Sequence, residues 1–101
     1  MSDHQRVIVD YLAAAFPAAR VTASDSAGGA LPVFPVIEGP VERRLEISRH
    51  ILDDASERAV VALLRTNRIA ETMRDQPGKR IVISRDRCAE LVVEIGPLDG
   101  A

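Results

Sequence analysis

The chain has 101 residues, of which 47% are hydrophobic and 28% charged, with a net charge of −2. This length corresponds to one domain, residues 1–101, that can bury a core without disulfides. A single cysteine, Cys88, excludes an internal disulfide, and no apolar run approaches the ~20 residues needed to cross a bilayer. We therefore expect a soluble, cytoplasmic protein without membrane contact.

Arginine and alanine dominate the composition. Arginine supplies all but one of the 13 basic side chains, which together with the many alanines is typical of a GC-rich, bacterial genome. The functional alternative is that guanidinium groups serve in bidentate recognition of phosphate or carboxylate. Aromatic side chains are limited to Tyr11, Phe16 and Phe34, so a base-stacking surface is not expected.

Residues 2–16 are predicted to form an amphipathic helix. Ser2 followed by Gln5 is a capping-box pattern, and Pro17 ends the periodic run. A signal peptide is not expected, because Asp10 interrupts the apolar segment. The apolar stripe of this helix comprises Ile8, Tyr11, Leu12 and Ala15.

Residues 20–24 and 31–37 are predicted to form a hairpin. The apolar residues change here from a helical period to alternation, and a Gly-Gly pair between the two strands supplies the positive φ values of a tight turn. Pro32 and Pro35 lack backbone donors, so the second strand is expected at a sheet edge.

Residues 41–52 carry two competing patterns. Alternating apolar residues favour a strand, whereas Pro40 and a stripe at helical spacing would suit a helix. An internal echo favours the strand, because residues 43–49 match residues 79–85 in pattern and the latter follow a Pro-Gly turn. We therefore predict a strand over residues 42–50.

Residues 54–76 are predicted to form one long helix. Asp54 and Glu57 make an Asp-x-x-Glu capping pattern, and Pro77 with Gly78 ends the helix. At about 1.5 Å per residue the helix is roughly 30 Å long and should lie across the sheet. Its apolar stripe comprises Ala59, Val60, Leu63, Thr66, Ile69, Ala70 and Met73.

Residues 80–85 and 90–95 are predicted to form a second hairpin. If Ile83 lies opposite Val93, the apolar residues of both strands share one face, whereas a shift by one residue would bury glutamates. Residues 97–101 are expected to be a frayed tail. The shared face would hold Ile81, Ile83, Leu91, Val93 and Ile95, and the opposite face Val82, Ser84, Val92 and Glu94.

These elements predict an α+β domain in the order α-β-β-β-α-β-β. We expect a two-layer sandwich in which two helices cover one face of a mainly antiparallel sheet of four or five strands. The opposite face of the sheet and its edge strands would then be exposed to solvent.

No residue pattern indicates an active site. His4 and His50 are the only ordinary bases near neutral pH, and Cys88 lies beside two arginines without a positioned histidine. The chain lacks the spacing of a zinc, calcium or dinucleotide site. We assign no catalytic residue, metal ligand or cofactor and expect a non-enzymatic role, with a small enzyme of unmarked site as the alternative.

Charge is unevenly distributed along the chain. Residues 43–87 hold 11 basic and seven acidic side chains, a balance of +4, and the flanking segments carry −3 each. Clustered arginines would neutralise phosphates, so nucleic acid or another anionic ligand is one candidate partner. The simpler interpretation is that neighbouring carboxylates pair with these arginines. The candidate residues are Arg43, Arg44, Arg58, Arg65, Arg68, Arg85 and Arg87.

Exposed apolar strands suggest a different function. A sheet covered on only one face leaves apolar groups available for self-association or for capture of a partner strand. The leading hypothesis is a small interaction module that forms a homo-oligomer or binds a protein partner, and anionic-ligand binding is the alternative. The candidate interaction residues are Val33, Phe34, Val36, Ile37, Val82 and Val92.

Overall fold

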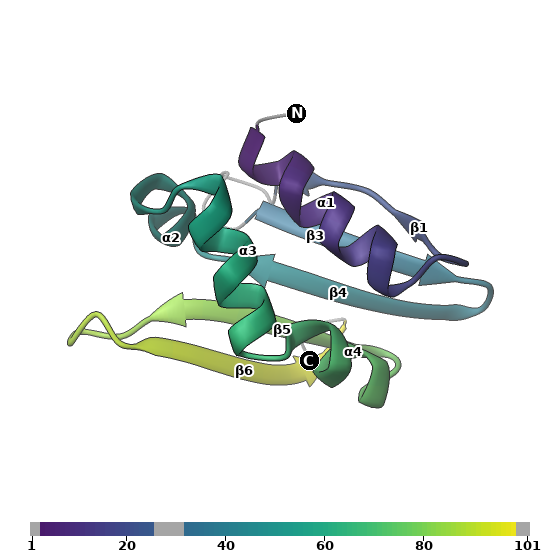
Figure 1. Cartoon of the computed structure of the whole chain (residues 1–101). Coiled ribbons are helices and arrows are strands. Elements are labelled where there is room, and N and C mark those ends of the chain that lie inside the picture. Colours follow the sequence, from purple (N-terminus) through teal and green to yellow (C-terminus); the bar gives the residue numbers. More distant parts are fainter. Residues whose placement is uncertain (1–2, 26–31, 99–101) are drawn as a thin grey trace.

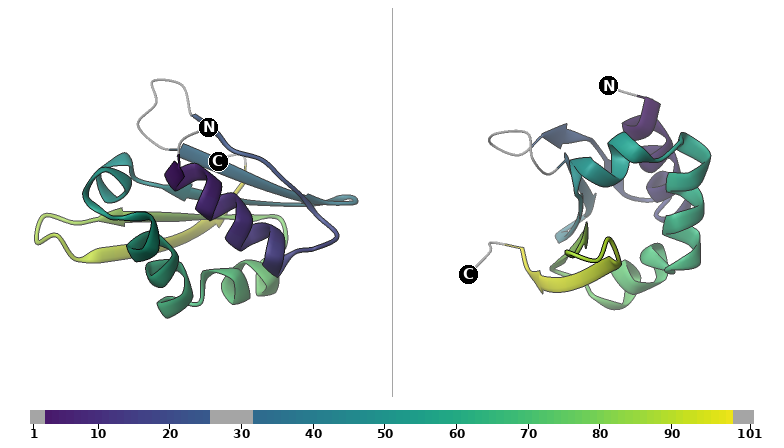
Figure 2. Two further views of the ribbon diagram at one scale, coloured as in Figure 1. Left: turned by 45° about the horizontal axis from the view of Figure 1, so that its top comes forward. Right: turned by 90° about the vertical axis from the view of Figure 1, so that its left-hand side faces the viewer.

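All the helices lie on one side of a mixed sheet (Figure 1), in a computed structural model that describes residues 3–25 and 32–98. The two layers separate clearly when the molecule is viewed along the sheet (Figure 2). The predicted α+β class is confirmed, although the described residues form four helices rather than two. In chain order the elements are α1 (Asp3–Ala15), β1 (Arg20–Val21), β2 (Ser24–Asp25), β3 (Pro32–Glu38), β4 (Val41–Ile47), α2 (Arg49–Asp54), α3 (Glu57–Thr66), α4 (Ile69–Asp75), β5 (Lys79–Arg85) and β6 (Leu91–Pro97).

The strands follow the order β1-β3-β4-β5-β6, and β2 pairs with β3 on the same side as β1. Four of the five pairings are antiparallel, and β4 with β5 is parallel. A parallel pair needs a crossover connection, which α2, α3 and α4 supply together. The sheet is therefore mixed, with one parallel pair at its centre.

The sequence echo has a structural counterpart in this parallel pair. Arg44 lies opposite Arg80, and Ile47 lies opposite Ile83, so the two similar segments are aligned in the same register as their sequences. Matching positions on adjacent parallel strands face the same side of the sheet. The similar patterns therefore place aliphatic residues together on the helix-covered side.

Residues 41–52 contain both of the structures that their sequence allowed. β4 ends at Ile47, the Ser48 N–H donates to the Ile83 carbonyl at 2.9 Å, and α2 begins at the next residue. The strand prediction over 42–50 is thus wrong for its last three residues. The chain turns there because Ile51 and Leu52 on α2 become buried against the core.

The strand that carries two prolines is not at the edge, contrary to expectation. β3 pairs with β4 on one side and with β1 and β2 on the other. The Pro35 carbonyl accepts from the Thr22 N–H at 3.3 Å, so the side of Pro35 that lacks an N–H also faces that segment. Because the ladder is already interrupted between β1 and β2, the missing donor is tolerated there. The predicted Gly-Gly turn lies outside the described residues.

The predicted helix over residues 54–76 is wrong as a single element. α3 starts after Ser56, whose hydroxyl accepts from the Ala59 N–H at 3.1 Å, so Ser56 rather than Asp54 is the N-cap. Arg68 has φ 53° and ψ 46°, a left-handed conformation that ends one helical path before α4 begins. The break lets α3 pack on α1 while α4 packs on β5.

Tyr11 on α1 connects the two helices across this break. Its hydroxyl donates to the Leu64 carbonyl at 3.3 Å and accepts from the Ala70 N–H at 3.2 Å. The last carbonyls of a helix and the first N–H groups of the next have no partner within their helices. Tyr11 therefore satisfies a group at each side of the break, which explains why a half-buried tyrosine stands on the apolar stripe of α1.

Replacing Tyr11 by phenylalanine is expected to lower the free energy of unfolding by about 1–2 kcal/mol, because both backbone groups lose their partner while the ring is kept. Denaturant unfolding followed by circular dichroism measures this loss. Asp10→Asn, on the exposed side of the same helix, is the control and should change stability by less than about 0.5 kcal/mol. Equal stability of Y11F and the parent chain would contradict the bridging role.

The core lies between the helices and the sheet. α1 contributes Ile8 and Leu12, as predicted, and the strands contribute aliphatic residues at alternate positions. The second hairpin has the predicted register, with Ile83 opposite Val93 and Ile81 opposite Ile95. The buried hydrophobic residues are Ile8, Leu12, Phe16, Phe34, Val36, Leu45, Ile47, Ile51, Leu52, Val60, Leu64, Ile69, Ala70, Met73, Ile81 and Ile83.

Candidate functional site

The helix layer does not cover β6. Val93 and Ile95 lie on the helix side of the sheet, yet they are 39% and 47% exposed. Their cross-strand neighbours on β5, Ile83 and Ile81, are at most 1% exposed. Within residues 3–25 and 32–98, Val93 and Ile95 are the exposed large hydrophobic side chains. With half-buried Leu91 they form an apolar stripe on β6, called here the β6 stripe (Leu91, Val93 and Ile95).

β6 is also an open edge of the sheet. It is last in the strand order and pairs only with β5 among the described strands. The opposite edge is formed by β1 and β2, which have two residues each, whereas β6 extends over seven. A long, regular edge offers a row of unpaired backbone groups to another strand. Of the two edges, β6 is therefore the one suited to pairing with a further chain.

The hydrogen-bond phase of the second hairpin determines which backbone groups face this edge. The Asp86 N–H donates to the Glu90 carbonyl at 3.0 Å, which marks these two residues as a hydrogen-bonded pair. Such pairs alternate along an antiparallel ladder, so the even-numbered residues of β6 direct their N–H and C=O groups toward β5. The edge therefore presents the backbone groups of Leu91, Val93 and Ile95.

The interaction residues predicted from the sequence do not form one surface. Phe34 and Val36 are fully buried in the core, so these two are corrected, because their side chains face the helices. The other four, Val33, Ile37, Val82 and Val92, lie on the opposite, helix-free face and are half-buried. Charged side chains interrupt that face, including an Arg44–Glu42 pair and an Arg80–Glu46 pair, each at 3.5 Å.

The sequence did not single out Val93 and Ile95, because their alternation with polar residues predicts a core-facing position. The predicted orientation is correct, because both side chains point to the helix side. Their exposure follows from where the helices end, since α4 packs on β5 and the described helices make no comparable contact with β6. No local pattern in β6 carries this information.

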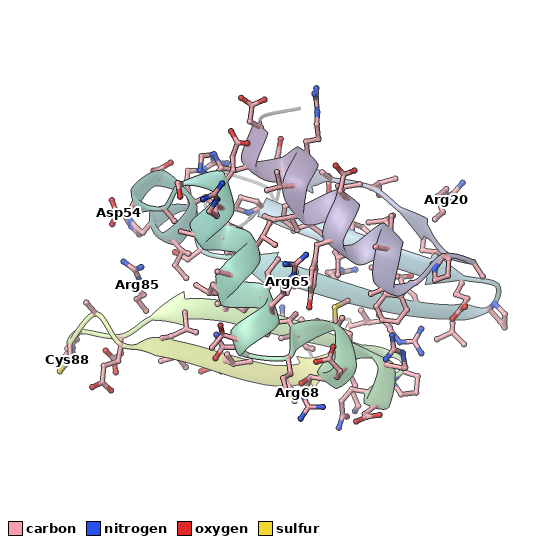
Figure 3. All side chains as sticks on the ribbon, in the orientation of Figure 1. Arg20, Asp54, Arg65, Arg68, Arg85 and Cys88 are labelled. Atoms are coloured by element: carbon pink, nitrogen blue, oxygen red, sulfur yellow. The ribbon has the colours of Figure 1, made fainter. Side chains whose placement is uncertain are left out.

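The seven candidate arginines are distributed over several parts of the molecule. Arg43 points into the core, Arg44 lies on the helix-free face, and Arg87 lies in the exposed turn of the second hairpin. Figure 3 shows Arg65, Arg68 and Arg85 at separate places along the helix side. Four of the candidates pair with acids. Arg43 lies 3.5 Å from Glu38 and Arg44 lies 3.5 Å from Glu42. Arg68 pairs with Glu71 at 3.4 Å, and Arg85 pairs with Asp54 at 3.7 Å.

Arg58 and Arg65 are the two candidate arginines that come together. Both lie beside an open groove between α1 and α3. The groove continues toward α4 as a depression of about 670 Å³, where Arg65 and Arg74 are balanced by Asp10 and Glu71. Arg74 is also engaged with the protein itself, since it donates to the Ala15 carbonyl at 3.2 Å. The groove therefore has mixed charge rather than an uncompensated basic surface.

The remaining reactive side chains do not assemble into a site. A ring nitrogen of His4 is hydrogen-bonded to the Ala55 carbonyl, and His50 and Cys88 are exposed at different places. Cys88 stands at the tip of the second hairpin (Figure 3), where its N–H donates to the Asp86 carboxylate at 2.9 Å. Among the side chains that the structure describes, no three His, Cys, Asp or Glu gather closely enough to hold a metal ion.

Comparison of the chain with protein-family models, with curated proteins and with solved structures gave no match. In the described part of the chain, no helix is long and apolar enough to span a membrane. The features that indicate a function are therefore those of the surface itself, above all the β6 edge.

Proposed function

We propose that this protein is a small interaction module that self-associates through the β6 edge. The observation that carries the proposal is the coincidence of two features on one strand. The β6 stripe exposes apolar side chains, and the same three residues hold the outward-pointing backbone groups. Strand addition at a sheet edge uses both, since main-chain hydrogen bonds provide affinity and alternate side chains provide specificity.

A second copy of the chain is the partner that we propose. A symmetric contact is self-complementary, so the same apolar stripe serves both sides of the interface. The acidic side chains of β6, Glu90 before the strand and Glu94 within it, lie on its helix-free side, so the apolar stripes of two copies can meet on the other side with no carboxylate between them. In a homodimer, each copy would reduce the solvent exposure of Val93 and Ile95 on the other.

The expected dimer is weak and reversible. Burying a fully exposed Val or Ile contributes about 1.5–3 kcal/mol, so these half-exposed residues contribute roughly 1 kcal/mol each. Backbone hydrogen bonds add about 0.5–1.5 kcal/mol each, against an association cost of about 4–15 kcal/mol. The balance corresponds to a transient interface rather than an obligate one.

The alternative function, binding of nucleic acid or another anionic ligand, has less support. The candidate arginines are spread over both faces of the sheet and the hairpin turn, and several are paired with carboxylates or with backbone carbonyls. Charge neutralisation of a phosphate chain needs cations aligned along one surface. The groove at Arg58 and Arg65 does not supply that alignment.

The test is the mass of the full chain in solution as a function of concentration. Sedimentation or light scattering up to about 1 mM should show a rise from 11.0 kDa toward twice that value. I95K should abolish the rise, because a charge would then enter the interface. T22K, the same new side chain at the exposed opposite edge, is the control and should leave self-association unchanged. A chain that stays monomeric throughout, or an I95K variant that dimerises normally, would overturn the proposal.

A further inference from the structure

The β6 edge is specific enough to define how two copies would pair. This step rests on the proposed self-association and concerns its geometry. Such a pairing is defined by the relative direction of the two β6 strands and by their register. Three features of β6 determine the direction and the register: which backbone groups point outward, which face carries the β6 stripe, and where the two glutamates lie.

The direction follows from the two faces of β6. Two parallel β6 strands would be related by a two-fold axis that lies in the plane of the sheet and runs along the strands. One sheet would then be turned over relative to the other, so that the helix-covered face of one copy would continue into the helix-free face of the other. The β6 stripe of one copy would then continue into the face that carries Val92 and Glu94 in the other. An antiparallel arrangement, with the two-fold axis perpendicular to the sheet, keeps both stripes on the same side. The antiparallel pairing is therefore favoured.

The backbone phase restricts the register to three choices. The outward-pointing groups of one copy must meet outward-pointing groups of the other, and these belong to Leu91, Val93 and Ile95. Within the strand this requirement is met when the two-fold axis passes through Val92, through Val93 or through Glu94. Any other central register places fewer of these groups opposite one another.

Two of the three registers oppose like charges. With the axis at Glu94, the two Glu94 side chains lie directly opposite, and Leu91 lies opposite a proline, Pro97, that has no N–H to donate. With the axis at Val92, Glu90 of each copy lies opposite Glu94 of the other. Like charges directly opposite destabilise a strand pair, so both arrangements are disfavoured.

The third register has no such conflict. With the axis at Val93, the two Val93 residues lie opposite each other, and Leu91 of each copy lies opposite Ile95 of the other. On the helix-free face Glu94 lies opposite Val92, and Glu90 lies opposite Gly96, which has no side chain. The two β6 stripes then form one continuous apolar surface of six side chains along the junction.

We infer that two copies of this chain pair through antiparallel β6 strands in the register centred on Val93. The sheets of the two copies join into one continuous sheet, with both helix layers on the same side. The contact is closed, because each copy uses its single long edge. The interrupted edge at β1 and β2 stays free, so the assembly stops at two copies.

Disulfide trapping tests the register while keeping both glutamates in place. In a Cys88→Ser background, single cysteines replace residues of the β6 stripe, and mild oxidation traps the pairs that lie opposite. Opposed Cα atoms in a hydrogen-bonded antiparallel pair are about 5.5 Å apart, within the range for a disulfide. V93C should cross-link with itself, and a mixture of L91C and I95C should form the mixed disulfide.

Two further mixtures report the competing registers. V93C with I95C would give the mixed disulfide if the axis were at Glu94, and L91C with V93C if it were at Val92. We expect each of these to be lower than the L91C–I95C product by about fivefold, from the like-charge pairs. A dominant V93C–I95C or L91C–V93C product would overturn the register.

The failure of this inference is distinguishable from that of the proposed function. If the parent chain dimerises and I95K abolishes dimerisation, but neither the V93C–V93C nor the L91C–I95C disulfide forms, the proposed function stands and the inferred register is wrong. If the parent chain remains monomeric at all concentrations, the proposed function itself fails. R87C, an exposed position in the hairpin turn, should not cross-link in the predicted register and controls for random collision.

Discussion

Phe34→Ala is expected to lower the free energy of unfolding by about 3–5 kcal/mol. Phe34 is fully buried between the sheet and the helices, and it is among the largest of the completely buried side chains. Its removal leaves a cavity that the neighbouring strand, β4, cannot fill without breaking its register with β3. Since small domains are stable by only about 5–15 kcal/mol, this one change should remove a large part of the total.

The matched control is Val33→Ala on the same strand. Val33 faces the helix-free side and is only half-buried, so its loss should cost about 1 kcal/mol or less. Urea unfolding of the two variants, followed by circular dichroism, gives both values. If F34A and V33A lowered the free energy of unfolding by similar amounts, Phe34 would not be a core residue. Its prediction as an interaction residue would then stand.

Arg43→Ala is expected to cost about 2–4 kcal/mol, although arginine is normally a surface residue. Its Nε donates to the Met73 carbonyl at 2.8 Å, and its guanidinium lies 5.1 Å from the centre of the Phe16 ring. The side chain is 9% exposed and is also 3.5 Å from Glu38. Truncation removes the packing of the aliphatic stem together with the hydrogen bond and the cation–π contact.

Arg44→Ala provides the comparison one residue further along β4. The Arg44 side chain lies on the helix-free face with 30% exposure, and its nearest carboxylate, Glu42, is itself well exposed. Surface pairs of this kind contribute about 0–1 kcal/mol. The Arg44 guanidinium also donates to the Leu98 carbonyl at 3.2 Å, so R44A should cost about 1 kcal/mol, clearly less than R43A. Thermal or denaturant unfolding measures the contrast. An R43A variant as stable as R44A would contradict the buried role of Arg43.

The pair of arginines also shows what alternation can and cannot predict. The strand period of residues 41–47 puts Arg43 on the inward face and Arg44 on the outward face, and in the structure Arg43 is buried and Arg44 is half-buried on the helix-free side. Whether an inward arginine interrupts the strand or becomes part of the core depends on its partners. The Met73 carbonyl on α4 and the Phe16 ring after α1 come from distant segments, so no local pattern could reveal them.

The proline-bearing strand and the long helix were mispredicted for related reasons. Pro35 indicates a position without a backbone donor, and the sequence offers an edge as the simplest solution. The fold instead places that position beside the gap between β1 and β2. The break at Arg68 is stabilised in part by Tyr11, which lies more than fifty residues away along the chain. In both cases the local sequence pattern has a structural effect, but contacts with residues distant in the sequence determine what that effect is.

The candidate site divides in the same way between sequence and structure. The sequence predicts the register of the second hairpin, because a shift by one residue would move its glutamates to the apolar face. That register places Val93 and Ile95 on the helix side and fixes the spacing of the β6 stripe. It does not say that the stripe is exposed, since exposure depends on the reach of α3 and α4 across the sheet.

The amino-acid sequence by itself determines much about this protein. Its length, apolar content and two periodicities specify an α+β domain with an aliphatic core, because a pattern of period 2 or 3.6 can bury only one face of a strand or helix. Only the tertiary structure decided which elements cover which faces. The helices end over β5, so the same alternation that buries Ile81 and Ile83 leaves Val93 and Ile95 in solvent. Burial is a property of neighbours in space, and those neighbours are brought together by the whole chain.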